Sequence, residues 1–435
     1  MRSSTSSGIV PQVISDAVQL SLSIDDPSEV GTSIELFTGG GGLAMAMHNE
    51  GFRHLVAVEL NKRACATLRA NIAEPFDPEA GQATTLHSRW PLIEGDIRQV
   101  DFTRWMGKVD VVAGGVPCQP WSLGGVHKGY DDERNLWPEL FRVIRETRPR
   151  AIIAENVKGL LRSSFKPYYD YILNELSAPF EERIEGEDWQ DHDKRLRKAL
   201  AKQAVDPTER YDVKYLLVNA ADYGVPQVRW RVFVVAFRND LGLEGWKFPA
   251  ATHSDAALLR AQADGSYWDE HKVAKRYRYT PKIVAAQGEE NEGKQRWRTV
   301  RDAISGDSSR NEPRLGEPLG DKVEHPKHLH HYGWPGARQY PGHTPNELDR
   351  PAKTVKAGVH GVPGGETVLR RDDGSIRYMT VREVSRVMTF PDDWKLDGPR
   401  GEQMRQLGNA VPVVLGQAMA HSVVKALRSS SQSGS

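Results

Sequence analysis

Apolar runs alternate with amphipathic stretches along the first part of the chain. Between residues 32 and 156 helical stretches separate four apolar runs, SIELF, LVAVEL, VDVVAGG and AIIAEN. In the stretch 136–144, apolar side chains recur on one helical face, at Leu136, Leu140, Phe141 and Ile144. This rhythm predicts an α/β fold with a doubly wound parallel sheet on which that helix packs.

The rest of the chain predicts less regular structure. Two further strands are expected at VKYLLVNA and RWRVFVVAF, whereas the residues up to about 378 are rich in Gly, Pro, His and Trp and predict a smaller, irregular lobe. The charged run 181–205 predicts a solvated helical insertion, and the Ser-rich ends predict disordered tails. We therefore expect a tail at 1–30, a catalytic domain at 31–255, a small lobe at 256–378, a return to the catalytic domain at 379–428 and a tail at 429–435.

Composition narrows the class of protein only a little. The 435 residues suffice for two lobes, and the formal net charge of zero neither supports nor excludes nucleic-acid binding. No apolar run approaches the roughly twenty residues of a membrane helix, and the N-terminal residues lack the pattern of a secretory signal. We expect an intracellular protein whose two cysteines, Cys65 and Cys118, are thiols.

A glycine-rich turn, FTGGGG at residues 37–42, lies between the first strand and a short helix. Glycines allow a sharp turn and a close approach to a ligand, although a strand-to-helix turn also uses glycine for geometry alone. Glu59 follows about twenty residues on, where an acidic side chain can bind ribose hydroxyls. Asp96 offers an acceptor for an adenine amino group. Because the turn is not GxGxxG, S-adenosylmethionine fits better than NAD.

Candidate catalytic groups follow the third and fourth apolar runs. Cys118 lies in GGVPCQPWS, directly after VDVVA, where ligands bind in α/β sheets. A lone cysteine is more often a small core residue, and Cys65 in a helical stretch fits that description. Glu155 lies near the end of AIIAEN and is expected on the same rim as Cys118, although a carboxylate there could also cap the next helix.

A basic motif, QVRWR, enters the last predicted strand. Strand alternation places Gln227, Arg229 and Arg231 on one face, which suits an anionic partner, while the alternative is solvated charge on a sheet edge.

Taken in order, these blocks resemble the cytosine-5 DNA methyltransferases of prokaryotic restriction-modification systems. The blocks are ELFTGGGGLAMA, VAVEL, GDI, GGVPCQPWS, RNLWPELFRVI, ENV, QVRWR, RYMTVREVSRVMTFPDDW and QLGNAVP. The resemblance covers most of residues 33–239 and 377–420. It implies a Rossmann-like, S-adenosylmethionine-dependent sheet, with the small lobe as the target recognition domain. The departures are modest: Glu35 replaces a common Asp, Gly40 is an extra residue in the turn, and Ala410 replaces a frequent Ser.

The resemblance also assigns roles to residues. Cys118 becomes the nucleophile that attacks carbon 6 of cytosine, Glu155 contacts ring nitrogen 3 and the exocyclic amine, and Arg229 steadies both the base and Glu155, with Arg231 and Gln119 in support. The implied cofactor pocket, for S-adenosylmethionine and its product S-adenosylhomocysteine, consists of Phe37, Gly39, Gly41, Gly42, Glu59, Leu60, Asp96, Ile97, Pro117, Leu136, Asn409, Ala410 and Val411.

Double-stranded DNA is the implied substrate, with the target base rotated out of the duplex. The expected DNA contacts are Ser122, Lys128 and Arg134 in a lid-like loop, together with Gln227, Thr354, Arg338 and Gln339. The histidines at 325–331 lack partnering cysteines, so we expect no metal. Transfer RNA cytosine is an alternative substrate, and a catalytically inert DNA-binding regulator is a second alternative. We expect a cytoplasmic monomer on nucleoid DNA, with a cognate restriction endonuclease that forms no stable complex with it.

Overall fold

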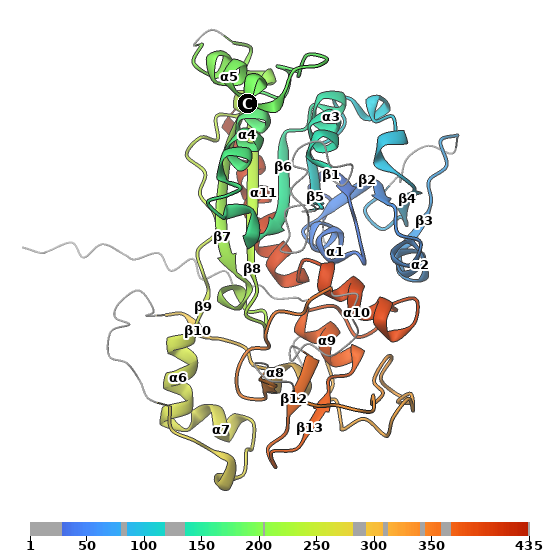
Figure 1. The fold of residues 1–435 in the computed structure, drawn as a ribbon, viewed down its shortest axis with the longest axis vertical. Coiled ribbons are helices and arrows are strands. Elements are labelled where there is room, and N and C mark those ends of the chain that lie inside the picture. Colours follow the sequence, from blue (N-terminus) through green and yellow to red (C-terminus); the bar gives the residue numbers. More distant parts are fainter. Residues whose placement is uncertain are drawn as a thin grey trace, which may run out of the picture.

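The computed structural model describes residues 28–79, 85–117, 135–202, 205–281, 293–307, 312–339, 344–357 and 367–433 (Figure 1). Several residues singled out from the sequence lie outside this described part of the chain. They are Cys118, Gln119, Ser122, Lys128 and Arg134.

A sheet with eight strands among the described residues forms the centre of the larger lobe. Its order is β3 (Ala73–Pro75), β4 (Trp90–Glu94), β2 (Phe52–Glu59), β1 (Gly31–Leu36), β5 (Val111–Gly115), β6 (Ala151–Val157), β8 (Trp230–Arg238) and β7 (Tyr211–Asn219). The predicted strands are confirmed, and β1, β2, β5 and β6 are parallel as expected, whereas the later strand β8 runs antiparallel to both β6 and β7. The apolar pattern of a buried strand is the same in either direction, so it could not reveal this reversal.

Helices cover both faces of this sheet. Alternate strand residues such as Ile34 and Ile152 share a core with α3 (Trp137–Thr147) and α4 (Lys166–Ser177). Intervening residues such as Ala113 and Ile153 pack with α1 (Gly42–Asn49) and α11 (Val413–Ser433). The segment Arg400–Ser431 is long and apolar enough to cross a membrane, but 83% of its most apolar window is buried in the protein, as in a core helix.

The charged insertion is more closely packed than the sequence predicted. Its helix α5 (Trp189–Leu200) begins at the side-chain cap Asp188 and buries Leu196 against α4. His192 is also buried and lies 3.0 Å from the hydroxyl of Tyr171. The expectation of a solvated helix is therefore wrong for the face of α5 that carries His192, Leu196 and Ala199. The apolar residues of this helix are few, but they lie on one face.

The expected C-terminal tail is also a correction, since α11 continues to Ser433. The hydroxyls of Ser430 and Ser431 donate to the carbonyl of Leu427, and the guanidinium of Arg150 donates to both hydroxyls. These hydrogen bonds pair the hydroxyl groups of Ser430 and Ser431 within a helix, although the Ser-rich composition of this segment predicted disorder.

The smaller lobe combines short elements with irregular chain (Figure 1). A small core around Leu258 and Trp268 joins α6 (Asp255–Asp264) and α7 (Ser266–Glu270), beside β9 (His253–Ser254) and β10 (Gln295–Arg296). The remaining elements pack with the flank of the large sheet around Trp90 and Leu92. These are α8 (Val300–Ser305), β12 (Val368–Arg370), α9 (Val381–Val387) and α10 (Arg400–Asn409), together with α2 (Lys62–Asn71) of the larger lobe. β12 also pairs with β11 (Asn346–Glu347) and β13 (Ile376–Tyr378) in a small sheet.

Short 3₁₀ turns link the strands and helices. They are η1 (Ile97–Gln99), η2 (Thr103–Trp105), η4 (Lys158–Leu161), η5 (Pro207–Glu209), η6 (Ala220–Tyr223), η7 (Asn239–Leu241) and η8 (Lys275–Tyr277).

Candidate active site

A cleft opens at the carboxyl ends of β1, β2, β5 and β6. A cavity of about 610 Å³ and an adjoining one of about 540 Å³ share several lining residues. The structure brings together nearly all of the predicted cofactor residues here: Phe37, Gly39, Gly42, Glu59, Leu60, Asp96, Ile97, Pro117, Leu136, Asn409, Ala410 and Val411. Gly41 does not line the cleft, because it is the N-cap of α1 and faces Trp394 and Leu68.

The glycine turn needs unusual backbone angles and close packing. Phe37 and Gly41 have positive φ values of 54° and 97°. A Cβ atom on Gly42 would lie 2.2 Å from the carbonyl oxygen of Val411, so only glycine lets the turn meet the α10–α11 junction. The C-terminal part of the chain therefore forms the back of the turn.

Glu59 fixes the open side of the same turn. Its carboxylate oxygens accept hydrogen bonds from the backbone N–H groups of Gly39, at 2.7 Å, and Asn61, at 2.6 Å. Burial raises the pKa of this carboxyl group, while the N–H donors favour its charged form. Each carboxylate oxygen of Glu59 can still accept a further hydrogen bond, for example from a ligand hydroxyl.

The walls of the cleft suit a nucleoside with a positively charged group. Leu60 is 67% exposed at the rim, and Phe37 lies beside it, so a flat ring would meet apolar surface. Asp96 already caps η1 by accepting from the N–H of Arg98. The carboxyl groups of Glu59 and Glu155 line the same space and can attract a cation. These residues fit S-adenosylmethionine.

The side of the cleft that the resemblance predicts for the cytosine, called the base side, contains a buried ion pair. Glu155 lies two residues before the end of β6, and the reversed strand β8 places Arg231 opposite Val157. The Nε atom of Arg231 donates to Glu155 Oε1 at 2.7 Å. Burial raises the pKa of the Glu155 carboxyl group, and the positive charges of Arg231 and Arg229 oppose that rise. Arg231 thus holds the buried carboxyl group of Glu155 in one orientation.

Comparison with known proteins identifies the family of the chain. The model of the C-5 cytosine-specific DNA methylases matches residues 31–178 and 190–425. The chain belongs to this family.

Several relatives match the methyltransferase over most of its length. It is 30% identical to the type II methyltransferase M.Eco47II of Escherichia coli, over 92% of this chain and 80% of the relative. It is 28% identical to M.NgoMIV of Neisseria gonorrhoeae, over 91% and 98%.

Solved structures share the fold. A DNA modification methyltransferase encoded within an E. coli prophage superposes with a TM-score of 0.52 at 18% identity, over 92% of this chain and 99% of that one. A Spodoptera frugiperda DNMT2 mutant gives 0.51 at 16% identity, over 90% and 99%.

The two arginines of the methyltransferase differ in their contacts with Glu155. The sequence assigned Arg229 to the direct support of Glu155, but Arg231 makes that contact. Arg229 is fully buried and donates to the carbonyls of Val355, at 2.7 Å, Gly408, at 2.7 Å, and Ala410, at 3.0 Å. It therefore clamps three backbone segments behind the cleft and acts on Glu155 through its positive charge rather than through a hydrogen bond.

Gln227 is likewise a correction. It was expected to contact DNA, but it is fully buried, accepts from the N–H of Val355 at 3.0 Å and donates to the sulfur of Met388. The proposed alternation failed because β8 begins only at Trp230. Thr354 is half-buried and donates its hydroxyl to the carbonyl of Val228, so this donor is not available to DNA.

Other expected contacts keep their status as predictions. Arg338 and Gln339 are exposed in irregular chain, as base-reading residues would have to be. Cys65 is buried in α2, donates to the carbonyl of Glu59, and burial raises its pKa to about 11, as a core thiol requires.

Sequence reasoning missed part of the cleft. Asn61, Arg98, Arg405 and Gln406 line it as well. Asn61 had a readable signal, since it lies two residues after the acidic end of β2 and caps α2 by accepting from the N–H groups of Arg63 and Ala64. Arg405 and Gln406 come from α10, far along the chain, and no local pattern places them there.

Two clusters of possible metal ligands have other partners. Both ring nitrogens of His331 lie within hydrogen-bond distance of protein groups, the hydroxyl of Thr380 and the carbonyl of Gly316. Glu270 and Asp302 approach one another near His271, but both carboxylates accept from the guanidinium of Arg296.

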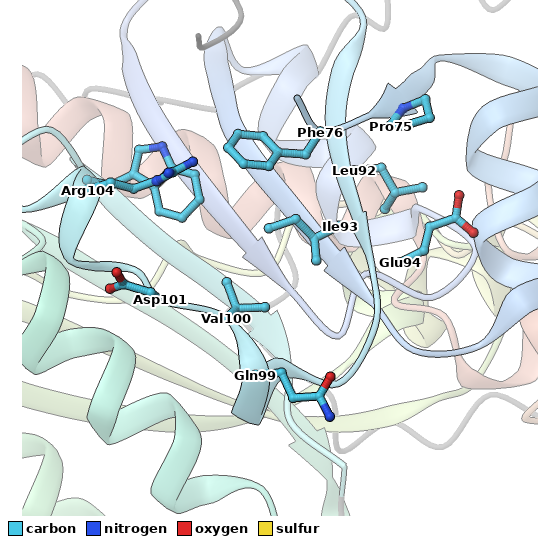
Figure 2. Close-up of a pocket in the computed structure, with 10 residues that line it drawn as sticks. Pro75, Phe76, Leu92, Ile93, Glu94, Gln99, Val100, Asp101 and Arg104 are labelled. Carbon is cyan, nitrogen blue, oxygen red and sulfur yellow. The ribbon is translucent and has the colours of Figure 1, made fainter. Parts of the chain in front are cut away.

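A separate hollow of about 490 Å³ lies at the outer edge of the sheet (Figure 2). Its lining includes Phe76, Ile93 and Arg104, whose guanidinium lies 5.3 Å from the centre of the Phe76 ring. The turn around Asp96 separates it from the cofactor cleft, and none of the predicted site residues lines it.

Proposed function

We propose that this DNA cytosine-5 methyltransferase modifies a cytosine within one short sequence of double-stranded DNA, as the modification component of a restriction-modification system. The observation that carries the proposal is the Glu155–Arg231 pair, which faces the same cleft as the glycine turn and Glu59. The type II methyltransferases that match nearly the whole chain support the restriction-modification context. By the same reasoning we propose a monomer acting on nucleoid DNA in the cytoplasm, with a cognate endonuclease that forms no stable complex with it.

The cofactor side would hold S-adenosylmethionine through Glu59 at the ribose, Phe37 and Leu60 against the adenine ring, and Asp96 at its amino group. When bound, this cofactor supplies an electrophilic methyl group on a sulfonium. The residues of the cleft orient it and limit access of water.

Carbon 5 of cytosine is a poor nucleophile, so the base must first be activated. We propose that the Cys118 thiolate attacks carbon 6, forming a carbon–sulfur bond and moving the carbon 5–carbon 6 π electrons to carbon 5. After carbon 5 is methylated, loss of its proton restores the double bond and expels the thiolate. Charge that develops at ring nitrogen 3 during attack would be stabilised by the carboxyl group of Glu155, which Arg231 holds in place.

A cytosine stacked within a duplex cannot enter such a cleft. We therefore propose that the target base rotates out of the helix, at a cost of about a few kcal/mol for unstacking and unpairing. The irregular chain of the small lobe, with Arg338 and Gln339 exposed, would read neighbouring bases.

The test uses labelled S-adenosylmethionine with unmethylated genomic DNA and, side by side, transfer RNA, followed by bisulfite sequencing. The proposal predicts label only in DNA, at one short motif, with the wild-type protein and none with Cys118→Ser. Label in transfer RNA alone would replace the DNA assignment, and equal activity of Cys118→Ser would remove the covalent step.

A further inference from the structure

The glycine turn of the cofactor cleft is held by a tryptophan from the other end of the chain. Trp394 lies in residues 391–399, between α9 and α10, and is buried. Its indole N–H donates to the carbonyl oxygen of Gly40 at 3.1 Å. Its ring also packs on Gly41, where a Cβ atom would lie only 3.0 Å from it. The turn at 37–42 is thus fixed both by a hydrogen bond and by a close ring contact.

The segment that carries Trp394 is itself anchored to the larger lobe. The side chain of Asn71 binds Lys395 through both its backbone groups, donating to the carbonyl at 2.8 Å and accepting from the N–H at 2.9 Å. The N–H of Asp397 donates to the hydroxyl of Thr67 at 2.8 Å. Both anchors lie on α2, so the indole cannot move away from the turn without breaking contacts with this helix.

On its other side the same segment is tied to the small lobe through Arg382. This fully buried guanidinium donates to the carbonyls of Leu329, Pro391 and Trp394, at 2.9, 2.9 and 3.2 Å. The N–H of Leu396 donates to His330 Nε2 at 3.0 Å. Direct contacts therefore run from the backbone of the small lobe at 329–330, through Arg382 and Trp394, to Gly40.

We propose that Trp394 is a positioning residue for cofactor binding, and that the Arg382–Trp394 contacts transmit the state of the recognition lobe to the glycine turn. This inference rests on the proposed function, because it takes the cleft to be the cofactor site. The coupling is reciprocal: if target DNA orders the recognition lobe and thereby alters cofactor affinity, the cofactor alters DNA affinity by the same factor.

The test compares Trp394→Phe with Trp90→Phe. Both change a buried indole to a phenyl ring in the same apolar cluster, but the Trp90 indole N–H has no hydrogen-bond partner in the described part of the chain. The dissociation constant of S-adenosylhomocysteine is measured by calorimetry without DNA. We expect Trp394→Phe to weaken binding by about three- to tenfold, as the loss of one buried hydrogen bond predicts, and Trp90→Phe to leave it within about twofold of wild type.

Two further measurements separate positioning from general destabilisation. In steady-state assays Trp394→Phe should raise KM for S-adenosylmethionine while kcat is retained, whereas a loss of folded protein would lower the apparent kcat alone. The calorimetric titration is then repeated with a saturating duplex that contains the mapped target. We expect the duplex to change the cofactor dissociation constant of wild type and to change that of Trp394→Phe less.

Each result decides something different. Equal dissociation constants for the two variants would overturn the positioning role. The proposed transmission from the recognition lobe to the glycine turn would be overturned by either of two results. One is that the duplex leaves the cofactor dissociation constant of wild type unchanged, and the other is that it changes that of Trp394→Phe as much as that of wild type. Failure of wild type itself to bind S-adenosylhomocysteine would instead contradict the proposed function.

Discussion

Two buried glutamates line the same cleft in opposite electrostatic surroundings. Glu155, on the base side, pairs with the guanidinium of Arg231. Glu35, on the cofactor side, faces neutral groups: its Oε1 lies 2.9 Å from the hydroxyl of Ser33, which lies 2.7 Å from Nδ1 of His54. Burial raises the pKa of both carboxyl groups, but the positive charges of Arg231 and Arg229 oppose that rise at Glu155, whereas only the hydrogen bond of Ser33 opposes it at Glu35.

The hydrogen positions around Glu35 follow from what each partner can accept. His54 Nε2 lies 3.1 Å from the carbonyl of Ala44, which only accepts, so Nε2 carries a proton. In a neutral ring Nδ1 must then accept from Ser33, and the hydroxyl has no second proton for Glu35. The carboxyl group therefore supplies its own. Burial accordingly raises the pKa of Glu35 to about 8 and lowers that of His54 to about 3.

The difference separates two tasks within one cleft. The cofactor side is held by backbone turns and by hydrogen bonds from backbone N–H groups to Glu59, which fix its shape. The base side concentrates charge where the reaction would develop charge. Substitutions on the base side should therefore lower kcat, and those on the cofactor side should change cofactor affinity or stability.

The largest expected effect is on the base side. Glu155→Gln should reduce kcat by about 10²- to 10⁴-fold, because a proton donor and charge partner at ring nitrogen 3 is lost. Cofactor affinity should change little. Single-turnover methyl transfer and calorimetry measure the two quantities. Glu175→Gln is the control, since Glu175 is equally buried but lies outside the cleft, in α4. A normal kcat for Glu155→Gln would remove the distinction between the two sides.

The two arginines should separate stability from catalysis. Arg229→Lys should lower the free energy of unfolding by about 3 kcal/mol, because an ammonium cannot reach all three carbonyls and remains buried. Arg231→Lys should leave stability nearly unchanged and lower kcat, since it contacts Glu155 at the cleft. Urea unfolding and turnover of both variants test this, and the reverse pattern would restore the roles that the sequence first indicated.

On the cofactor side, Glu59→Gln should raise KM for S-adenosylmethionine about tenfold and leave kcat nearly unchanged. The amide oxygen is a weaker acceptor than the carboxylate for the N–H groups that define the turn and for ribose hydroxyls. Steady-state kinetics at saturating DNA measures the effect. A loss confined to kcat would place Glu59 with the base side.

The smallest effect concerns pH. A carboxyl group whose pKa is raised on folding binds its proton more tightly in the folded state, so its contribution to stability is lost as pH rises through about 8. Wild type should lose about 1.4 kcal/mol of unfolding free energy between pH 7 and pH 9 relative to Glu35→Gln, which cannot ionise. Urea unfolding of both proteins at the two pH values provides the comparison, and parallel pH profiles would mean that Glu35 is already ionised at pH 7.

Local patterns predicted the sheet, the glycine turn and Glu155. Strands show runs of apolar residues, and turns and strand ends show glycine and polar residues at definite positions in the sequence. They failed for Arg229 and Gln227, whose partners lie far along the chain, at Val355, Met388 and Gly408. They also failed for β8, whose reversal brings Arg231 to Glu155. Side-chain chemistry suggested anion binding, but Arg229 binds backbone carbonyls, and Gln227 binds the N–H of Val355 and the sulfur of Met388.

The central claim is a covalent bond between Cys118 and the target cytosine. A duplex carrying 5-fluorocytosine at the mapped target position tests it directly, since fluorine at carbon 5 cannot leave as a proton and the elimination step is blocked. Incubation with S-adenosylmethionine and mass spectrometry of the digested protein should give a peptide containing Cys118 joined to the methylated base, and no such product with Cys118→Ser. An adduct on another residue, or methylated DNA formed by the wild type without any adduct, would contradict the account.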